Sequence, residues 1–321
     1  MNRAIPSTIE AAALCKMADR GQIVDGILDG PLALDNAIDP EAAGARVPII
    51  LTSRADSVVT RLASCAVAGL VVAWKRRAVA RADSGPYSAA YQRGPAMTNT
   101  VIGLLLFPNI TQLDLTGPFE VFAKMPGADV RLIWKTLEPV RAESGMHILP
   151  NTTLADCPAL DVIVVPGGPG MNPLMEDEEV LSFLRVQAAG ARFVGSVCTG
   201  ALVLGAAGLL RGKRATSHWS VRDLLARFGA IPTNRRVVRD GNTMTGGGVT
   251  AGIDFALTMV EELMGKPVAE GIQLGIEYAP APPFNAGTPE TAPAAVLEAV
   301  RARGAALRAV REAIVGRVTG S

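Results

Sequence analysis

The sequence predicts an α/β fold for residues 97–321, in which a doubly wound, mostly parallel sheet is sandwiched by helices. From Val101 onward, strand-like apolar runs alternate with helix-like segments, the order typical of such sheets. The run Val101–Phe107 is continuously apolar, as expected for a central strand buried on both faces. A second apolar run, Phe193–Val197, passes at Cys198 directly into a helix-like run. In open sheets of this kind, ligands bind at the carboxyl ends of the strands.

The other elements follow from the same periodicities. Gly117-Pro118 lies near the start of a helix expected over Gln112–Lys124, and Asp240-Gly241 is a hairpin signal. The further strands expected are Val130–Trp134, Asp161–Val165, Ala215–Trp219, Val237–Arg239 and Thr243–Thr245. The further helices expected are Val221–Phe228, Ile253–Met264 and a terminal helix over 290–315, rich in Ala and Arg, which could lie on the surface or cover a partner subunit.

Composition argues against several classes of function. The net charge is +1 and no basic run is interleaved with aromatic residues, so we expect no nucleic-acid partner. The four cysteines form no CxxC pair and there are two histidines, so we expect no metal centre. The longest apolar stretch, Ala63–Trp74, is about half the length of a membrane span, and no signal peptide is recognisable. We therefore expect a cytoplasmic protein without membrane contact.

The first 96 residues differ in composition from the rest of the chain. Residues 76–96 are rich in Arg, Ala, Ser, Gly and Pro, which predicts a linker, and Met97 looks like an internal start site. The segments Lys16–Ile38 and Gly44–Ala68 resemble two separated pieces of the phosphate acetyl/butyryltransferases. The resemblance implies that residues 1–75 are a truncated, poorly packed remnant without transferase activity.

Cys198 is the predicted nucleophile. A strand that turns sharply into a helix at a cysteine lifts the sulfur to the carboxyl edge of the sheet. It also places the sulfur over free amide N–H groups and the positive end of the helix dipole, which favours the thiolate. The small residues Gly195, Ser196 and Gly200 relieve crowding at such an elbow. A buried structural cysteine is the alternative interpretation.

Five further residues are expected at the same edge of the sheet. Asp114 follows the first strand and is either a helix N-cap or an acid/base group. Gly167 and Gly168 could provide N–H groups for an oxyanion hole, or could form only a tight turn. Thr199 could hydrogen-bond the start of its helix, or could orient substrate and water. His218 could hold a thiolate, or could have a structural role.

Four motifs together resemble the ThiJ/PfpI superfamily, which has the class I glutamine amidotransferase-like fold. They are LLFPNITQLDLTGPFEVF, VVPGGPG, SVCTGALVLGAAGLLRGKRATSHW and TGGGVTAGIDFAL. Within the superfamily, Asp114, Cys198-Thr199 and the tail Pro282–Ala292 are most similar to the isonitrile hydratases.

This resemblance implies that a small-molecule isocyanide and water are converted to an N-substituted formamide. Cys198 would attack the terminal carbon to give a thioimidate. Asp114 would supply a proton and then help water attack, with Thr199 as the third catalytic residue. The resemblance further implies no cofactor and a homodimer.

Two other hypotheses remain open. Another enzyme of the superfamily, such as a glyoxalase-like hydratase of reactive carbonyls, would use the same residues. The cysteine motif also resembles the ligand-sensing domain of AraC-type regulators. Those regulators continue into a helix-turn-helix pair, for which the roughly 45 residues after Glu277 are too few.

Overall fold

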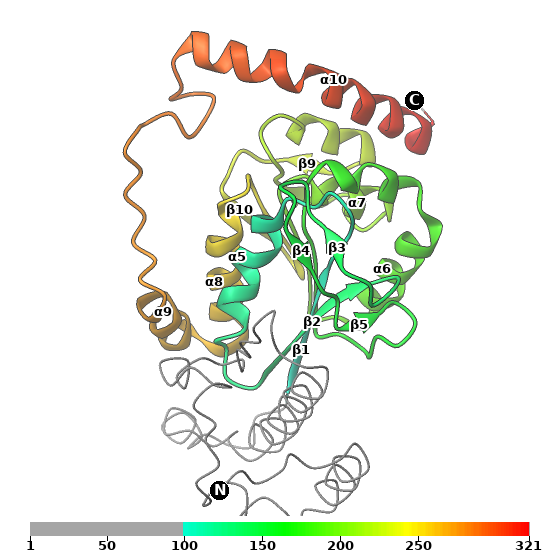
Figure 1. Cartoon of the computed structure of the whole chain (residues 1–321), viewed down its shortest axis with the longest axis vertical. Helices are drawn as coiled ribbons and strands as arrows, with labels where there is room; N and C mark the ends of the chain where they lie inside the picture. Colours follow the sequence, from blue (N-terminus) through cyan, green and yellow to red (C-terminus); the bar gives the residue numbers. More distant parts are fainter. Residues whose placement is uncertain (1–98, 321) are drawn as a thin grey trace, which may run out of the picture. The chain divides into compact units, whose positions relative to one another are not determined.

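The computed structural model describes residues 99–320 (Figure 1). The predictions of a transferase-like remnant at residues 1–75, a linker at 76–96 and a start site at Met97 lie outside the described residues.

A seven-stranded sheet forms the centre of the domain, in the order β10-β11-β7-β6-β1-β2-β5. All neighbouring strands run parallel except β10 and β11, which form an antiparallel hairpin at the edge. Its strands are β1 (Thr100–Leu105), β2 (Ala128–Trp134), β5 (Thr152–Thr153), β6 (Val162–Val165), β7 (Phe193–Val197), β10 (Val237–Asp240) and β11 (Thr243–Gly246). The predicted doubly wound, mostly parallel sheet is therefore confirmed.

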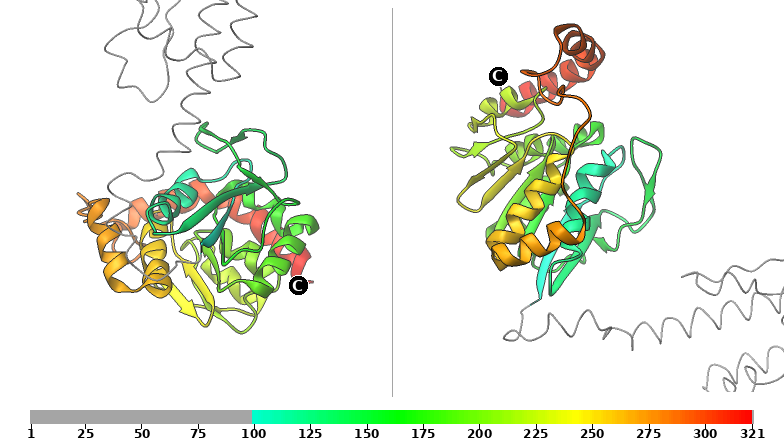
Figure 2. Two further views of the ribbon diagram at one scale, coloured as in Figure 1. Left: turned by 90° about the horizontal axis from the view of Figure 1, so that it is seen from below. Right: turned by 90° about the vertical axis from the view of Figure 1, so that its left-hand side faces the viewer.

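Helices cover both faces of this sheet. On one face α5 (Gln112–Phe122) packs on α8 (Ala251–Met264), and α9 (Lys266–Gly275) packs on α8 in turn. On the other face α6 (Glu178–Gly190) packs on α7 (Gly200–Ala206), as the views in Figures 1 and 2 show. Because β6 and β7 are buried at every position, their side chains serve the cores on both faces.

Some segments differ from the prediction. The strand expected over Ala215–Trp219 is reduced to β8 (Arg214–Ala215), which pairs with β9 (Ile231–Pro232). The helix expected over Val221–Phe228 is a 3₁₀ helix, Arg222–Phe228. β5 and the small hairpin of β3 (Val140–Arg141) and β4 (His147–Ile148) were not predicted, because two-residue strands carry no measurable periodicity.

The terminal helix is α10 (Ala294–Thr319), and it lies over its own domain, beside α7 and the 3₁₀ helix Arg222–Phe228 (Figure 1). An exposed connection leads to it from α9 along the outside of the domain. Only the last third of α10 contributes to the hydrophobic core, through Ile314 and Val315. α10 thereby covers the end of the sheet where strands β1, β6 and β7 finish.

The contact between α8 and β7 yields a stability prediction. Phe255 is fully buried, and a Cβ built on Gly195 would lie 2.6 Å from its Cζ, so the ring lies directly on the strand that leads to Cys198. Phe255→Ala should destabilise the domain by about 3–5 kcal/mol, because it leaves a cavity beneath β7. Urea unfolding measures the loss. Leu274→Ala, at a position that is 83% exposed, is the control and should change stability by less than about 0.5 kcal/mol. Equal midpoints for the two variants would contradict the prediction.

Candidate active site

Cys198 lies on a strained elbow between β7 and α7. Its φ is 56°, in the left-handed region that a residue with a side chain rarely adopts, and it is 5% exposed. Its N–H donates to the carbonyl oxygens of Gly247 at 2.7 Å and Gly246 at 3.1 Å, which fixes the turn. A Cβ on Gly200 would lie 2.0 Å from the Val165 carbonyl oxygen, so the helix starts this close to β6 only because residue 200 is glycine.

Asp114 lies in the first turn of α5 and is fully buried. It does not cap the helix: the N-cap position belongs to Thr111, and no side chain caps the helix there. The Asp114 Oδ2 atom accepts a hydrogen bond from the Gly167 N–H at 3.0 Å. The Cys198 thiol lies beside this carboxyl, close enough for each group to shift the pKa of the other. The structure thus unites the two residues expected to perform the chemistry, as the Asp114–Cys198 pair.

The Gly167 and Gly168 amides are used differently from the predicted oxyanion hole. The Gly167 N–H is engaged by Asp114, and the Gly168 N–H donates to Thr199 Oγ1 at 3.0 Å. A Cβ on Gly167 would lie 2.6 Å from Thr199 N and 2.8 Å from Asp114 Oδ2. These amides therefore hold the carboxyl and the hydroxyl in place. Thr199 itself makes no side-chain cap to α7, so its hydroxyl serves the glycine loop.

His218 contributes a neutral ring to the site. Its Nδ1 accepts a hydrogen bond from the Ser220 N–H at 3.3 Å and lies 2.8 Å from Ser220 Oγ, and its ring packs on Trp219. Burial, reinforced by the charges of Arg311 and Arg222, lowers the pKa of His218 to about 4. A histidine with this pKa is uncharged at neutral pH, so it offers no positive charge to a thiolate, and its contacts with Ser220 and Trp219 favour the structural role of the two considered.

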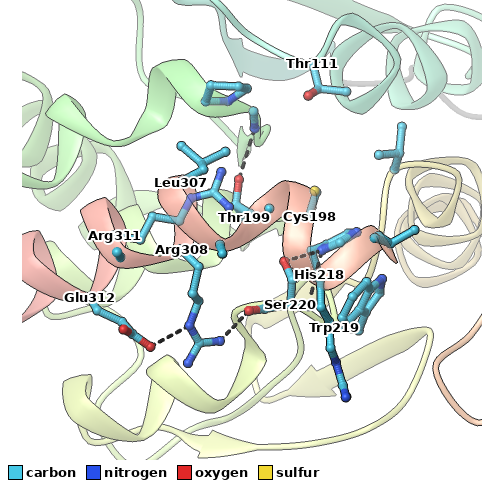
Figure 3. Close-up of a pocket in the computed structure, with 18 of the residues that line it drawn as sticks. Thr111, Cys198, Thr199, His218, Trp219, Ser220, Leu307, Arg308, Arg311 and Glu312 are labelled. Carbon is cyan, nitrogen blue, oxygen red and sulfur yellow. Dashed lines mark hydrogen bonds and ion pairs between the residues drawn. The ribbon is translucent and has the colours of Figure 1, made fainter. Parts of the chain in front are cut away.

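These residues open onto a cavity of about 670 Å³ (Figure 3). The sheet edge contributes Cys198, Thr199 and His218 to its wall, and α10 forms the opposite wall. The contribution of α10 to this wall, including the buried Arg311, was not predicted from the sequence. The available signal was the position of Arg311 three residues before Ile314, which puts the arginine on the apolar face of the helix.

Electrostatics set the resting state of the Asp114–Cys198 pair. Burial raises the pKa of Asp114 to about 7, with a further rise from Glu143, against the lowering effect of the Cys198 thiol and of the hydrogen bond from the Gly167 N–H. Burial also raises the pKa of the Cys198 thiol well above its usual value, and the Asp114 charge raises it further. Burial and the carboxylate oppose the thiolate that the elbow was expected to favour, and they outweigh the Thr199 N–H that stabilises the anion. At neutral pH the thiol keeps its proton beside a carboxyl group that can readily accept or donate one.

A strained elbow that presents a cysteine to a buried carboxyl group defines a protein of the nucleophile-elbow α/β class. The chain belongs to the DJ-1/PfpI family, whose model matches residues 101–262. The part of the chain that the structure describes shows no group of three or more His, Cys, Asp and Glu side chains that could hold a metal. Within that same part, none of the helices combines the length and apolar character needed to cross a membrane.

Two relatives cover most of the described domain. The chain is 60% identical to the isonitrile hydratase of Pseudomonas putida over 216 residues, which make up 67% of this chain and 95% of that protein. A solved structure of a ThiJ/PfpI family protein from Pseudomonas syringae is 46% identical, with a TM-score of 0.68. The match covers 73% of this chain and 96% of that one.

A third relative matches a smaller share of the chain. The phosphate acetyltransferase of Rhizobium meliloti is 50% identical over 118 aligned positions, which cover 23% of this chain and 37% of that protein. The chain therefore spans little more than a third of this relative. The partial resemblance to phosphate acetyltransferases expected from the sequence is confirmed.

Removal of the Asp114 charge should make Cys198 more reactive. Because the carboxylate raises the pKa of the thiol, Asp114→Asn should lower that pKa and speed alkylation by iodoacetamide at pH 8, about tenfold for each unit of pKa. The rate is followed by mass spectrometry of the peptide that contains Cys198. Glu120→Gln, on the exposed side of the same helix, is the control and should react like the parent. Slower alkylation of Asp114→Asn would show that the carboxylate assists the thiol instead.

Proposed function

We propose that the chain hydrates isocyanides to N-substituted formamides, with Cys198 as nucleophile and Asp114 as acid and base. The observation that carries the proposal is the 60% identity to an isonitrile hydratase over 95% of that protein. The contact between the Cys198 thiol and the buried Asp114 carboxyl supports it, because the pair combines a soft nucleophile with a group that titrates near neutral pH.

The first step forms a covalent bond to sulfur. The terminal carbon of the isocyanide is its basic atom, and once protonated it becomes an electrophile. Asp114 takes the proton of the Cys198 thiol and passes it to this carbon as sulfur attacks. The C–S bond forms, one carbon–nitrogen bond order is lost, and the product is a thioimidate, R–N=CH–S–Cys198. The thioimidate contains all the atoms of the isocyanide and of the thiol, so this step consumes and releases nothing else.

The second step consumes water. Asp114 removes a proton from a water molecule as the water oxygen attacks the thioimidate carbon, and it passes this proton to the nitrogen. Collapse of the tetrahedral intermediate breaks the C–S bond, and Asp114 transfers the hydroxyl proton of the intermediate to sulfur, leaving R–NH–CHO and the free thiol. The Asp114 Oδ1 atom has no hydrogen-bond partner among residues 99–320, so one carboxyl oxygen is free for these transfers. Splitting the hydration at a covalent intermediate replaces one difficult step by two easier ones.

The cavity suits a small molecule with an apolar body. Its volume of about 670 Å³ lies within the range of small-molecule sites. The apolar part of its wall includes Trp219, Val249 and Leu307, while Thr199 and Cys198 lie at the reacting end.

We propose in addition that the protein is a cytoplasmic homodimer and that its first 75 residues have no transferase activity. The free thiols of Cys157 and Cys198 are consistent with a reducing compartment.

Turnover of cyclohexyl isocyanide to its formamide tests the reaction. Cys198→Ala should lose activity by about 10³-fold or more, because no other group in the cavity can form the thioimidate. Cys157→Ala is the matched control: this half-buried cysteine lies outside the cavity and its loss should leave the rate unchanged. Full activity of Cys198→Ala would refute the covalent mechanism. Turnover of methylglyoxal, with no turnover of isocyanide by the folded parent, would favour the reactive-carbonyl hypothesis.

The pH dependence should report Asp114. The productive state has one proton on the pair, held by the thiol, so Asp114 must be ionised before the first step. Because its pKa is raised to about 7, kcat/KM should rise as the pH increases through about 7 and level off above it. The measurement is kcat/KM for cyclohexyl isocyanide between pH 5 and 9. His218→Gln should keep this midpoint, since the pKa of His218 is lowered to about 4. A midpoint that moved in His218→Gln would assign the titration to the histidine.

A further inference from the structure

Arg311 on α10 is a buried cation that lacks a carboxylate partner. It is 6% exposed, although the first half of the same helix is mostly exposed. Its Nε donates to the neutral Asn172 Oδ1 at 3.1 Å, and none of the ion pairs formed within residues 99–320 includes it. Burial of an unpaired guanidinium is strongly unfavourable, so a compensating negative charge is expected nearby.

The neighbouring arginines Arg308 and Arg317 of α10 are each paired with carboxylates. Arg308 forms ion pairs with Asp223 and Glu312, and Arg317 forms two hydrogen bonds to Glu176, at 2.7 and 2.9 Å. The Arg308–Asp223 and Arg317–Glu176 pairs anchor the helix to the domain on either side of Arg311. Their geometry accounts for the docking of α10 without Arg311, so the burial of this third arginine needs a separate explanation.

Arg311 lies in the wall of the cavity together with Cys198 and Thr199 (Figure 3). Two negative charges can compensate Arg311: the one that the Asp114–Cys198 pair carries in its productive state, and that of Glu143 in the same cavity wall. The titratable and charged groups around the sulfur and the cavity come from five places. They are Asp114 on α5, Glu143 between β3 and β4, His218 after β8, Asp223 on the 3₁₀ helix Arg222–Phe228, and Arg301, Arg308, Arg311 and Glu312 on α10. Arg308 is held by its carboxylates and His218 is neutral, which leaves Arg311 as the buried positive charge at this end of the cavity.

We propose that Arg311 is a positioning residue that stabilises the thiolate of Cys198, so that α10 completes the nucleophile. The proposal rests on the proposed function only for its link to turnover. The Arg311 charge lowers the pKa of Cys198, whereas the pKa of Asp114 is set by burial, Cys198, Gly167 and Glu143. Arg311 therefore favours transfer of the proton from sulfur to carboxylate. The transfer breaks the S–H bond and forms an O–H bond within the pair, with no other reactant.

Charge-swap variants of the full-length chain test this role. The pH midpoint of Cys198 alkylation by iodoacetamide, read on the Cys198 peptide, reports the thiolate directly. Arg311→Gln should raise this midpoint by about one pH unit, which is tenfold slower alkylation at pH 8. Arg311→Lys, which keeps the charge, should restore most of the rate. Arg317→Gln removes an anchoring arginine of the same helix outside the cavity, and should leave the midpoint unchanged.

Asn172→Ala provides a variant that leaves α10 intact. It removes the hydrogen bond that holds the Arg311 side chain and should give an intermediate rise in the midpoint. An unchanged midpoint in Arg311→Gln would overturn the proposal, and so would an equal shift in Arg311→Lys, because charge would then not be the cause. A shift in Arg317→Gln as large as that in Arg311→Gln would assign the effect to loss of helix docking, and would also overturn it.

Turnover separates this proposal from the proposed function. With cyclohexyl isocyanide, Arg311→Gln should lower kcat about tenfold with little change in KM, because the neutral substrate does not need the cation for binding. If the parent turns over no isocyanide but the alkylation midpoints shift as expected, the proposed function fails and the role of Arg311 stands. If isocyanide is turned over and the midpoints do not shift, the reverse holds.

Discussion

The contact between Asp114 and Cys198 is the interaction on which the rest of the site depends. Neither group would be stable alone in the buried edge of the sheet as a charged species. In the productive state they share one proton between sulfur and oxygen, and buried backbone hydrogen bonds keep the two groups adjacent. The Gly167 N–H fixes the carboxyl, and two carbonyl oxygens fix the amide of the strained cysteine.

The topology explains why these two residues meet although 84 positions separate Asp114 from Cys198. β1 lies between β2 and β6, so the connections after β1 and β6 leave the sheet toward opposite faces. A crevice opens at the carboxyl ends of strands where such a reversal occurs. Asp114 follows β1, Gly167 follows β6 and Cys198 follows β7, and all three therefore face the same crevice. Glycine at 167 and 200 then allows the backbones to approach within contact distance.

Much of this arrangement could be predicted from the sequence. The apolar runs at Val101–Phe107 and Phe193–Val197 predict β1 and β7, and the parallel order places Asp114 and Cys198 at one edge. The direction of the Gly167 and Gly168 amides could not be predicted, because a glycine-rich turn can point its N–H groups at a ligand or at the protein. The ionisation state of Cys198 could not be predicted from the sequence either. It depends on how completely the site is covered, and distant segments supply that cover.

α10 shows why the remaining part of the site needs the tertiary structure. Arg311 is 113 positions from Cys198, and the exposed connection before α10 carries no pattern that fixes where the helix docks. Coverage by this helix has two opposing electrostatic effects on the sulfur. Exclusion of water raises the pKa of the thiol, while the guanidinium of Arg311 lowers it. The first effect is the larger, so the resting site keeps its thiol protonated. Under the proposed mechanism, a substrate that accepts the proton would then meet a thiolate whose stabilising charge is already in position, and the reaction rather than the binding step would activate the nucleophile.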